Sequence, residues 1–193
     1  AQIIITTIVA PLGVVAIAAN AFAIIAESLC YMPGYGIGEA ATTLAGQAYG
    51  AGRHKLVRRF GYITVGAAMA VMGIMGVALY LFAPQIISVM SPVEEIRILG
   101  AEILRIEAWA EPMFGAAIIS YGFFVGLGRT VLPSIMNLLS IWGVRLTLAT
   151  LLAPAMGLKG VWLAMCIELC FRGLIFLALL AFGRWRKETL EFV

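Results

Sequence analysis

The sequence predicts an all-α polytopic membrane protein, a bundle of six transmembrane helices of which the first is truncated. Its 193 residues are 63% hydrophobic and only 12% charged, and the mean hydropathy is +1.03. Soluble domains are about 45–50% apolar and about 25% charged, so a water-soluble fold would have too few charged side chains to cover its surface. Long apolar stretches recur along the chain, and a bilayer core needs about 20 apolar residues per helix.

The first predicted elements are a half-length helix and a very long one. Residues 1–10 are apolar almost from the start and stop at Pro11. They lack an initial Met and a basic leader region, so we expect a truncated helix from a longer protein and no signal peptide. The next span, residues 14–50, is interrupted by Pro33. At about 1.5 Å per residue it exceeds the bilayer thickness, so it should be kinked, tilted or protruding.

Four further spans complete a single lobe over residues 1–193. They are expected over residues 58–82, 93–128, 131–153 and 160–183, and a tail follows at 184–193. The first of them should end before Pro84, because proline disrupts a helix interior. The second has Ser91 as a plausible N-cap and Pro92 at the first helical position. Its amphipathic start should lie at the membrane interface and run straight into the span at Pro112.

The basic residues are distributed unequally between the two ends of the predicted bundle. One end carries Arg53, Lys55, Arg58, Arg59, Arg129, Arg184, Arg186 and Lys187, and the other carries Arg97, Arg105 and Lys159. Lys and Arg concentrate in cytoplasmic loops, so the sequence predicts a multi-pass protein of the cell membrane with a cytoplasmic C-terminus. Topology explains the net charge of +3, and nucleic acid is not expected as a partner.

Two helix ends share a pattern of glycines followed by arginine. The glycines are Gly46, Gly50 and Gly52 before Arg53, and Gly122, Gly126 and Gly128 before Arg129. Small residues four apart permit close helix approach, and a glycine just past a helix end tolerates the left-handed cap conformation. Convergent capping and an ancient duplication both explain the match, and we predict packing and capping roles for these glycines.

Glu27 is the strongest candidate for a functional residue. An ionisable group at mid-span costs on the order of 3 kcal/mol and marks a functional-site hypothesis by default. No basic residue lies within two helical turns of Glu27, whereas Asn20, Tyr31 and Tyr35 share its helix face. A buried carboxyl without a positive partner holds its proton more tightly, which suits a proton carrier or a cation site. The alternative is a carboxyl hydrogen-bonded to a neighbouring helix for packing alone.

The other intramembrane charges fall into two groups. Glu107 and Glu111 are four apart and share a face, where their repulsion favours protonation of one of them. The alternative is a solvated interfacial pair, matched by Arg105 or Arg97. The second group is a structural ion pair, since Glu168 precedes Arg172 by four residues, the favourable order on a helix. Arg145 is expected to bind Glu168 or a carbonyl group.

Enzymatic and metal chemistry are not expected. The single histidine, His54, lies in a predicted loop, and the sequence contains no Asp and no HExxH motif. Membrane aspartyl proteases, zinc proteases and metal-dependent lipid phosphotransferases therefore lack their essential parts. Cys30, Cys166 and Cys170 lie in apolar helical sequence and are interpreted as small hydrophobes.

Several stretches resemble, in order, the helices of one lobe of multidrug and toxic compound extrusion (MATE) transporters. The stretch from APLGVVAIAANAF to GQAYGAGR resembles the second helix of a lobe, and EPMFGAAIISYGFFVGLGRTVLPSIMN the fourth. The region beginning NLLSIWGVRL resembles the fifth and sixth, with Asn137, Trp142, Arg145 and the GLKGVW turn in place. Such transporters have twelve helices in two six-helix lobes and export cationic drugs and metabolites against Na⁺ or H⁺.

The resemblance implies that this chain is one lobe of such an antiporter, working by alternating access. The C-terminal lobe is favoured because the GRWRKETLEF tail resembles the end of a full transporter. The second and fourth helices would then line the central cavity, which places the Glu27 face and Glu111 where ions or substrate bind. Many members carry an acid one turn into the fourth helix, where Gly115 stands here. Glu111, one turn earlier, is expected to substitute for it.

The implied partners are the other six-helix lobe, the lipid bilayer and small cationic amphiphilic substrates, with H⁺ or Na⁺ as coupling ion and no other cofactor. Two alternatives remain open. One is a flippase for lipid-linked saccharides from the same superfamily, which should line its cavity with several basic residues; here only Arg145 and Arg172 lie within spans. The other is a non-transporting structural membrane subunit whose charges only hold helices together.

Overall fold

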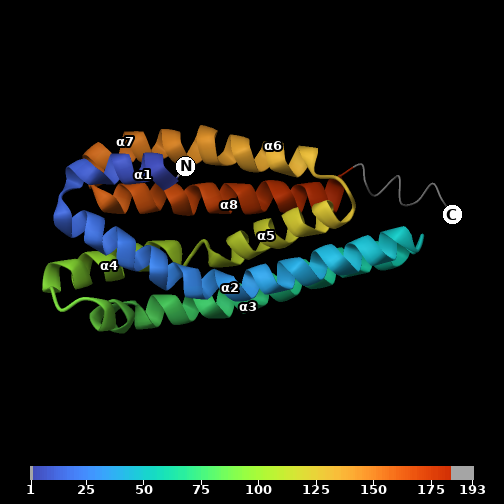
Figure 1. Ribbon diagram of the computed structural model, residues 1–193, viewed down its shortest axis with the longest axis horizontal. Coiled ribbons are helices and arrows are strands. Elements are labelled where there is room, and N and C mark those ends of the chain that lie inside the picture. The colour runs from blue at the N-terminus through green and yellow to red at the C-terminus, as the bar shows by residue number, and fades with distance from the viewer. Residues whose placement is uncertain (1, 184–193) are drawn as a thin grey trace.

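The computed structural model describes residues 2–183, and every regular element in that range is helical, which confirms the predicted class (Figure 1). The elements are α1 (Gln2–Val9), η1 (Ala10–Leu12), α2 (Val14–Gly50), α3 (His54–Met90), α4 (Glu94–Glu107), α5 (Glu111–Gly126), α6 (Val131–Leu139), the π-helical turn η2 (Ser140–Arg145), α7 (Leu146–Met156) and α8 (Leu158–Phe182). The predicted tail at 184–193 lies outside the described residues.

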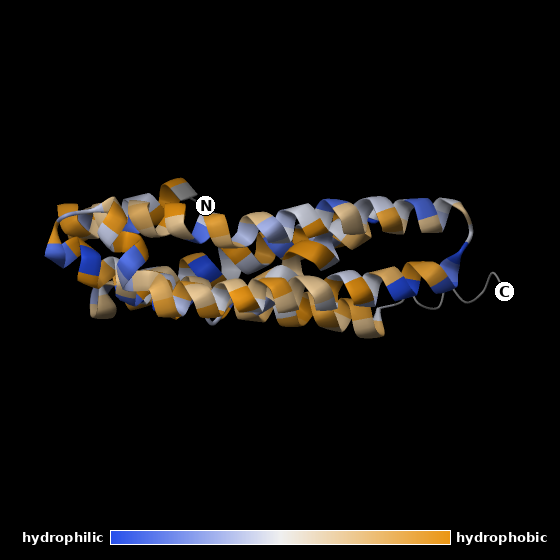
Figure 2. Cartoon of the chain, turned by 90° about the horizontal axis from the view of Figure 1, so that it is seen from below, coloured by the Kyte–Doolittle hydropathy of each residue, from blue (hydrophilic) through white to orange (hydrophobic). Residues whose placement is uncertain are grey.

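The long helices run side by side along the longest axis of the molecule (Figure 1). Helices α2, α3 and α8 and the α6–η2–α7 unit are each long and apolar enough to cross a membrane, and the bent pair α4–α5 makes a fifth span if counted as one. Hydrophobic residues predominate along the helices, and hydrophilic ones are frequent near both ends (Figure 2). This distribution is typical of a multi-pass membrane protein.

Prolines end fewer helices than the sequence suggests. The span predicted over residues 58–82 was expected to end before Pro84. This prediction is wrong, because α3 begins at His54 and continues to Met90. Helix α2 likewise passes through Pro33 as one continuous element of 37 residues, and α7 passes through Pro154. Proline removes one backbone donor, but in a membrane the remaining hydrogen bonds of a long helix are strongly favoured because lipid offers no replacement partners.

The expectation that the amphipathic start of residues 93–128 runs straight into the span at Pro112 is also wrong. Helices α4 and α5 are bent by 56° at the break between Glu107 and Glu111. Pro112 explains the bend, since it has no N–H to donate to the carbonyl of Ala108 four residues earlier. That carbonyl faces α3 instead, where a Cβ added to Gly76 would lie 2.7 Å from it. The bend therefore places two acidic residues at a break in the helix.

Most of the glycine roles follow the prediction. Helices α2 and α5 cross closely, since a Cβ on Gly122 would lie 2.9 Å from the carbonyl oxygen of Gly38, and one on Gly126 would collide with the backbone of Thr42. Gly46 lies in the same crossing, opposite Gly126. Gly52 and Gly128 cap α2 and α5 with φ of +68° and +73°. Gly50 does neither, because it ends α2 with nothing within 4 Å of an added Cβ.

The basic loops lie at one end of the bundle. The connections α2–α3, with Arg53, and α5–α6, with Arg129, are at the same end, and the turns α3–α4 and α7–α8 are at the other (Figure 1). This arrangement agrees with the predicted grouping of the basic residues, as far as the described residues extend. The assignment of the basic end to the cytoplasm stays a prediction.

Candidate functional site

A cavity of about 300 Å³ lies within the bundle, between α2, α5, the α6–η2 unit and α8. Its polar and aromatic lining residues come from all of these elements: Asn20, Glu27, Tyr31, Tyr35, Phe114, Asn137, Arg145, Trp162 and Arg172. The four α2 residues are spaced by seven and four positions, which keeps them on one face of a helix. The whole predicted polar face of α2 therefore lines the cavity.

Glu27 is buried in this cavity without a partner. Its residue is 8% exposed, and among the described residues no hydrogen bond or ion pair reaches its carboxylate. The packing alternative for Glu27, a carboxyl hydrogen-bonded to a neighbouring helix, therefore does not fit. Asn20 does have such a role, because its Oδ1 accepts a hydrogen bond of 2.9 Å from Nε1 of Trp162 and so joins α2 to α8.

Aromatic rings form a continuous wall beside Glu27. The ring of Tyr31 contacts those of Tyr35 and Phe114 edge to face, with centroids 5.5 and 5.7 Å apart. The guanidinium carbon of Arg172 lies 5.7 Å from the Phe114 ring centroid. Such ring faces attract aromatic groups and cations. The wall can therefore hold a flat aromatic ligand next to the acidic side chain.

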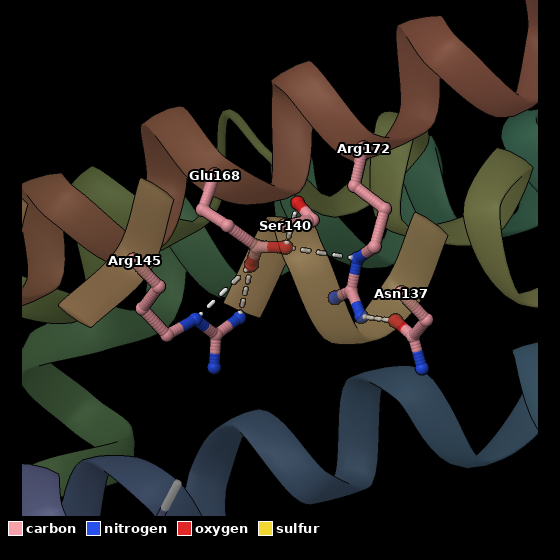
Figure 3. Close-up of polar contacts among 5 residues, drawn as sticks. All are labelled: Asn137, Ser140, Arg145, Glu168 and Arg172. Carbon is pink, nitrogen blue, oxygen red and sulfur yellow. Dashed lines mark hydrogen bonds and ion pairs between the residues drawn. The ribbon is translucent and has the colours of Figure 1, made fainter. Parts of the chain in front are cut away.

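Arg145 and Arg172 also line the cavity. Both belong to a network centred on Glu168 (Figure 3), which is fully buried and does not line the cavity. Its Oε2 accepts hydrogen bonds from Nε and Nη2 of Arg145 at 3.0 and 2.7 Å, and its Oε1 accepts one from the Ser140 hydroxyl at 2.6 Å. Nε of Arg172 lies 3.2 Å from Oε1, and its Nη1 donates to Asn137. The predicted Glu168–Arg172 ion pair is present, and Arg145 binds Glu168 too.

The π-helical turn η2 explains how one helix supplies two ligands of Glu168. Ser140 and Arg145 are five residues apart, at the two ends of this turn. In a π-helix the hydrogen bonds join residues five apart, so these positions share a face, whereas in an α-helix they would diverge. Both side chains consequently point at α8.

Glu107 and Glu111 are buried beside the cavity and do not line it. Each is 1% exposed, and Oε2 of Glu107 and both carboxylate oxygens of Glu111 have no hydrogen-bond partner. The solvated interfacial pair is therefore wrong, and Arg105 instead donates to the carbonyl of Tyr80 at 3.4 Å. Both acids are close enough to Glu27 to interact with it electrostatically. Glu107 and Glu111 thus lie at the α4–α5 break and interact electrostatically with Glu27 of α2, and Glu27 and Glu107 also interact with Arg145.

Packing explains why residue 115 is not acidic. A Cβ added to Gly115 would lie 3.0 Å from Sδ of Met72 and 3.2 Å from the carbonyl oxygen of Ala68, both on α3. Helices α3 and α5 are too close there for a longer side chain. The idea that Glu111 substitutes for the family acid stays a prediction.

Sequence reasoning missed four residues of the site: Phe114, Ser140, Trp162 and the hydrogen-bonding role of Asn137. Phe114 lies three residues after Glu111, and this helical spacing could have placed it near the acidic face. Ser140 could not have been found by α-helical spacing, because its position depends on the π-helical turn. Trp162 meets Asn20 across 142 positions of sequence, a pairing that no local pattern indicates.

Comparisons with known proteins identify a family, curated relatives and solved structures of the same fold. The MatE family model matches residues 1–151. A probable multidrug resistance protein NorM from Brucella suis is 31% identical over 92% of this chain, and one from Thermotoga maritima is 30% identical over 92%. The crystal structure of the Vibrio cholerae MATE transporter VcmN superposes with a TM-score of 0.88 at 16% identity, over 97% of this chain and 42% of VcmN. The chain spans 38–39% of the length of these two NorM relatives.

Proposed function

This chain belongs to the MatE family, and we propose on that premise that it forms one six-helix lobe, the C-terminal one, of a cation-coupled multidrug efflux antiporter. The proposed partner is the other lobe of the same protein, which fits the 38% of the Brucella relative's length that the chain spans. The two lobes rock about a central site and expose it to each side of the membrane in turn. The basic end of the bundle faces the cytoplasm.

The observation that carries this proposal is the unpaired carboxylate of Glu27 in the cavity. An ionisable group buried without a partner in a membrane protein is typical of ion pathways and proton relays. H⁺ or Na⁺ binds at Glu27, and Glu107 and Glu111 contribute through their proximity. Occupancy by the coupling ion changes the preferred facing of the lobes and lowers the affinity for substrate, because the ion binds the two states differently.

The test is a Glu27→Gln substitution in the full-length transporter. Gln keeps the shape of the side chain but cannot release a proton or neutralise a cation, so dye efflux driven by an H⁺ or Na⁺ gradient should be abolished while membrane insertion is retained. The matched control is Glu39→Gln, because Glu39 is on the same helix but is exposed and does not line the cavity. Normal gradient-driven efflux by a correctly inserted Glu27→Gln variant would refute the proposal.

A further inference from the structure

A groove between α3 and α4 lies on the outside of the bundle, apart from the central cavity. Helix α4 folds back along the last turns of α3 (Figure 1), and two hollows of about 340 and 370 Å³ lie between them. Trp109 of the first hollow is one helical turn from Arg105 of the second, so the hollows adjoin end to end. We call them the inner and outer parts of the α3–α4 groove. Of the described residues that line the groove, none also lines the central cavity.

The inner part of the groove is apolar and open to the outside. Gly73 lines it without a side chain, and the side chains around it are exposed: Val77 to 61%, Leu81 to 60% and Trp109 to 73%. In a membrane a furrow of this kind is filled by lipid, because an empty one would lose dispersion contacts along its whole lining. From Gly73 to Pro84 the groove follows α3 for about 16 Å, at about 1.5 Å per residue. This shape suits an acyl chain lying along the helix.

The outer part of the groove offers guanidinium donors. Nε of Arg105 donates to the carbonyl oxygen of Tyr80 at 3.4 Å, and the guanidinium carbon lies 5.6 Å from the Tyr80 ring centroid. These contacts hold Arg105 at the junction of the two parts, and its terminal nitrogens have no partner among the described residues. Arg97, two turns nearer the α3–α4 connection, is exposed and has no hydrogen bond or ion pair within the same set.

The charges of the outer part sum to a positive value. Two acids, Glu94 and Glu102, line it together with Arg97 and Arg105. Glu102 is neutralised by Lys159 of α8 at 2.7 Å, so one unpaired carboxylate stands against two arginines. Planar arginine donors match the oxygens of a phosphate, and the residual positive charge favours a head group with a net negative charge.

We propose that the α3–α4 groove is a binding site for one anionic phospholipid, with an acyl chain along the inner part and the phosphate at Arg97 and Arg105. Trp109 and Tyr80, whose ring centroids are 6.0 Å apart, lie between the two parts. Tryptophan and tyrosine are enriched where the hydrocarbon of a membrane meets its head groups, so this pair marks the same boundary on the bound lipid. The end of the bundle that holds the phosphate is the one opposite the basic loops.

Quenching of Trp109 fluorescence by brominated lipids tests the proposal in the full-length transporter. Phosphatidylcholine vesicles would contain the same small fraction of either brominated phosphatidylglycerol, which is anionic, or brominated phosphatidylethanolamine, which has a phosphate but no net charge. The signal of Trp109 is the difference between the wild type and Trp109→Phe, so all other tryptophans cancel. Phosphatidylglycerol should bind about fivefold more tightly, because one net positive charge near an anionic lipid contributes about this factor.

Two arginine variants test the position of the head group, each measured against Trp109→Phe in the same background. Arg105→Gln should lower the preference for phosphatidylglycerol toward equality. Arg97→Gln should lower it too, and since Arg97 has no hydrogen bond or ion pair among the described residues, its loss should not affect folding. Arg59→Gln is the matched control, because Arg59 is an exposed arginine at the other end of α3, and it should leave the preference unchanged.

A pair of glycine variants tests the position of the acyl chain. Gly73→Leu places a side chain in the inner part and should reduce quenching of Trp109 by both brominated lipids. An added Cβ at Gly73 meets only Pro112, at an ordinary contact distance of 3.6 Å, and leucine favours the helix more than glycine does. Gly66→Leu is the control, because Gly66 is exposed on the same helix and does not line the groove.

Equal quenching of Trp109 by the two brominated lipids would overturn the proposal, and so would a preference that persists in both arginine variants. Absence of quenching by either lipid would show that protein covers the groove, which overturns it as well. The measurement requires no ion gradient and no transport. Its outcome is therefore independent of the efflux function proposed above.

Discussion

Glu27 and Glu168 are both buried acids, but Glu27 lines the cavity whereas Glu168 lies behind the two arginines that line it. Glu168 receives two arginines and a serine hydroxyl. No hydrogen bond or ion pair among the described residues reaches Glu27, which interacts with Arg145 only at longer range. A buried charge is tolerated when it is paired and hydrogen-bonded. Glu168 therefore has the surroundings of a structural residue, and Glu27 those of a residue that changes its state during function.

The two acids at the α4–α5 break have surroundings that resemble those of Glu27. Glu107 and Glu111 are as deeply buried as Glu168, yet three of their four carboxylate oxygens have no partner. Broken helices at membrane depth commonly mark binding sites in transporters. Burial is thus similar for Glu107, Glu111 and Glu168, whereas the number of hydrogen-bond and ion-pair partners differs between them. We expect the acids without such partners to be the functional ones.

The largest effect expected from this comparison is on the stability of Glu168→Gln. The substitution leaves Arg145 and Arg172 buried without a counter-charge, and breaking a buried ion pair typically costs about 3–5 kcal/mol. The yield of monodisperse protein and its melting temperature in detergent should both fall strongly. Glu27→Gln is the matched comparison, because it removes no pairing and should leave both quantities nearly unchanged. Equal stability of the two variants would break the distinction between the two acids.

A smaller effect is expected where packing decides the position of an acid. Gly115→Ala adds only a Cβ, but this atom would lie 3.2 Å from the backbone oxygen of Ala68, and overpacking of this kind costs about 1–3 kcal/mol. Gly36→Ala is the control, since an added Cβ there meets nothing within 4 Å and alanine is the better helix former by about 1 kcal/mol. The melting temperature should fall for the first variant and hold or rise for the second. The reverse order would show that α5 has room for an acid at residue 115.

The sequence was sufficient for the class of fold and for the polar face of α2, because hydrophobic content and helical spacing are local properties. The ends of helices were less predictable. Pro84 lies inside α3, whereas Pro112 marks the bend between α4 and α5, so the same residue type has two outcomes that the local sequence does not separate. Pairings such as Trp162 with Asn20 required the tertiary structure, and so did the π-helical turn that directs Ser140 and Arg145 toward Glu168.

The smallest effect is expected for an acid that is paired but exposed. Glu102 of α4 forms an ion pair of 2.7 Å with Lys159 of α8, and both side chains are 42% exposed. Water and salt screen such a pair, which contributes about 0–1 kcal/mol. Glu102→Gln should therefore lower the melting temperature only slightly, and high salt should remove the difference from the wild type. The ion-pair distances at Glu102 and Glu168 are similar, so a large loss in Glu102→Gln would mean that pairing alone, and not burial with pairing, sets the cost of removing an acid.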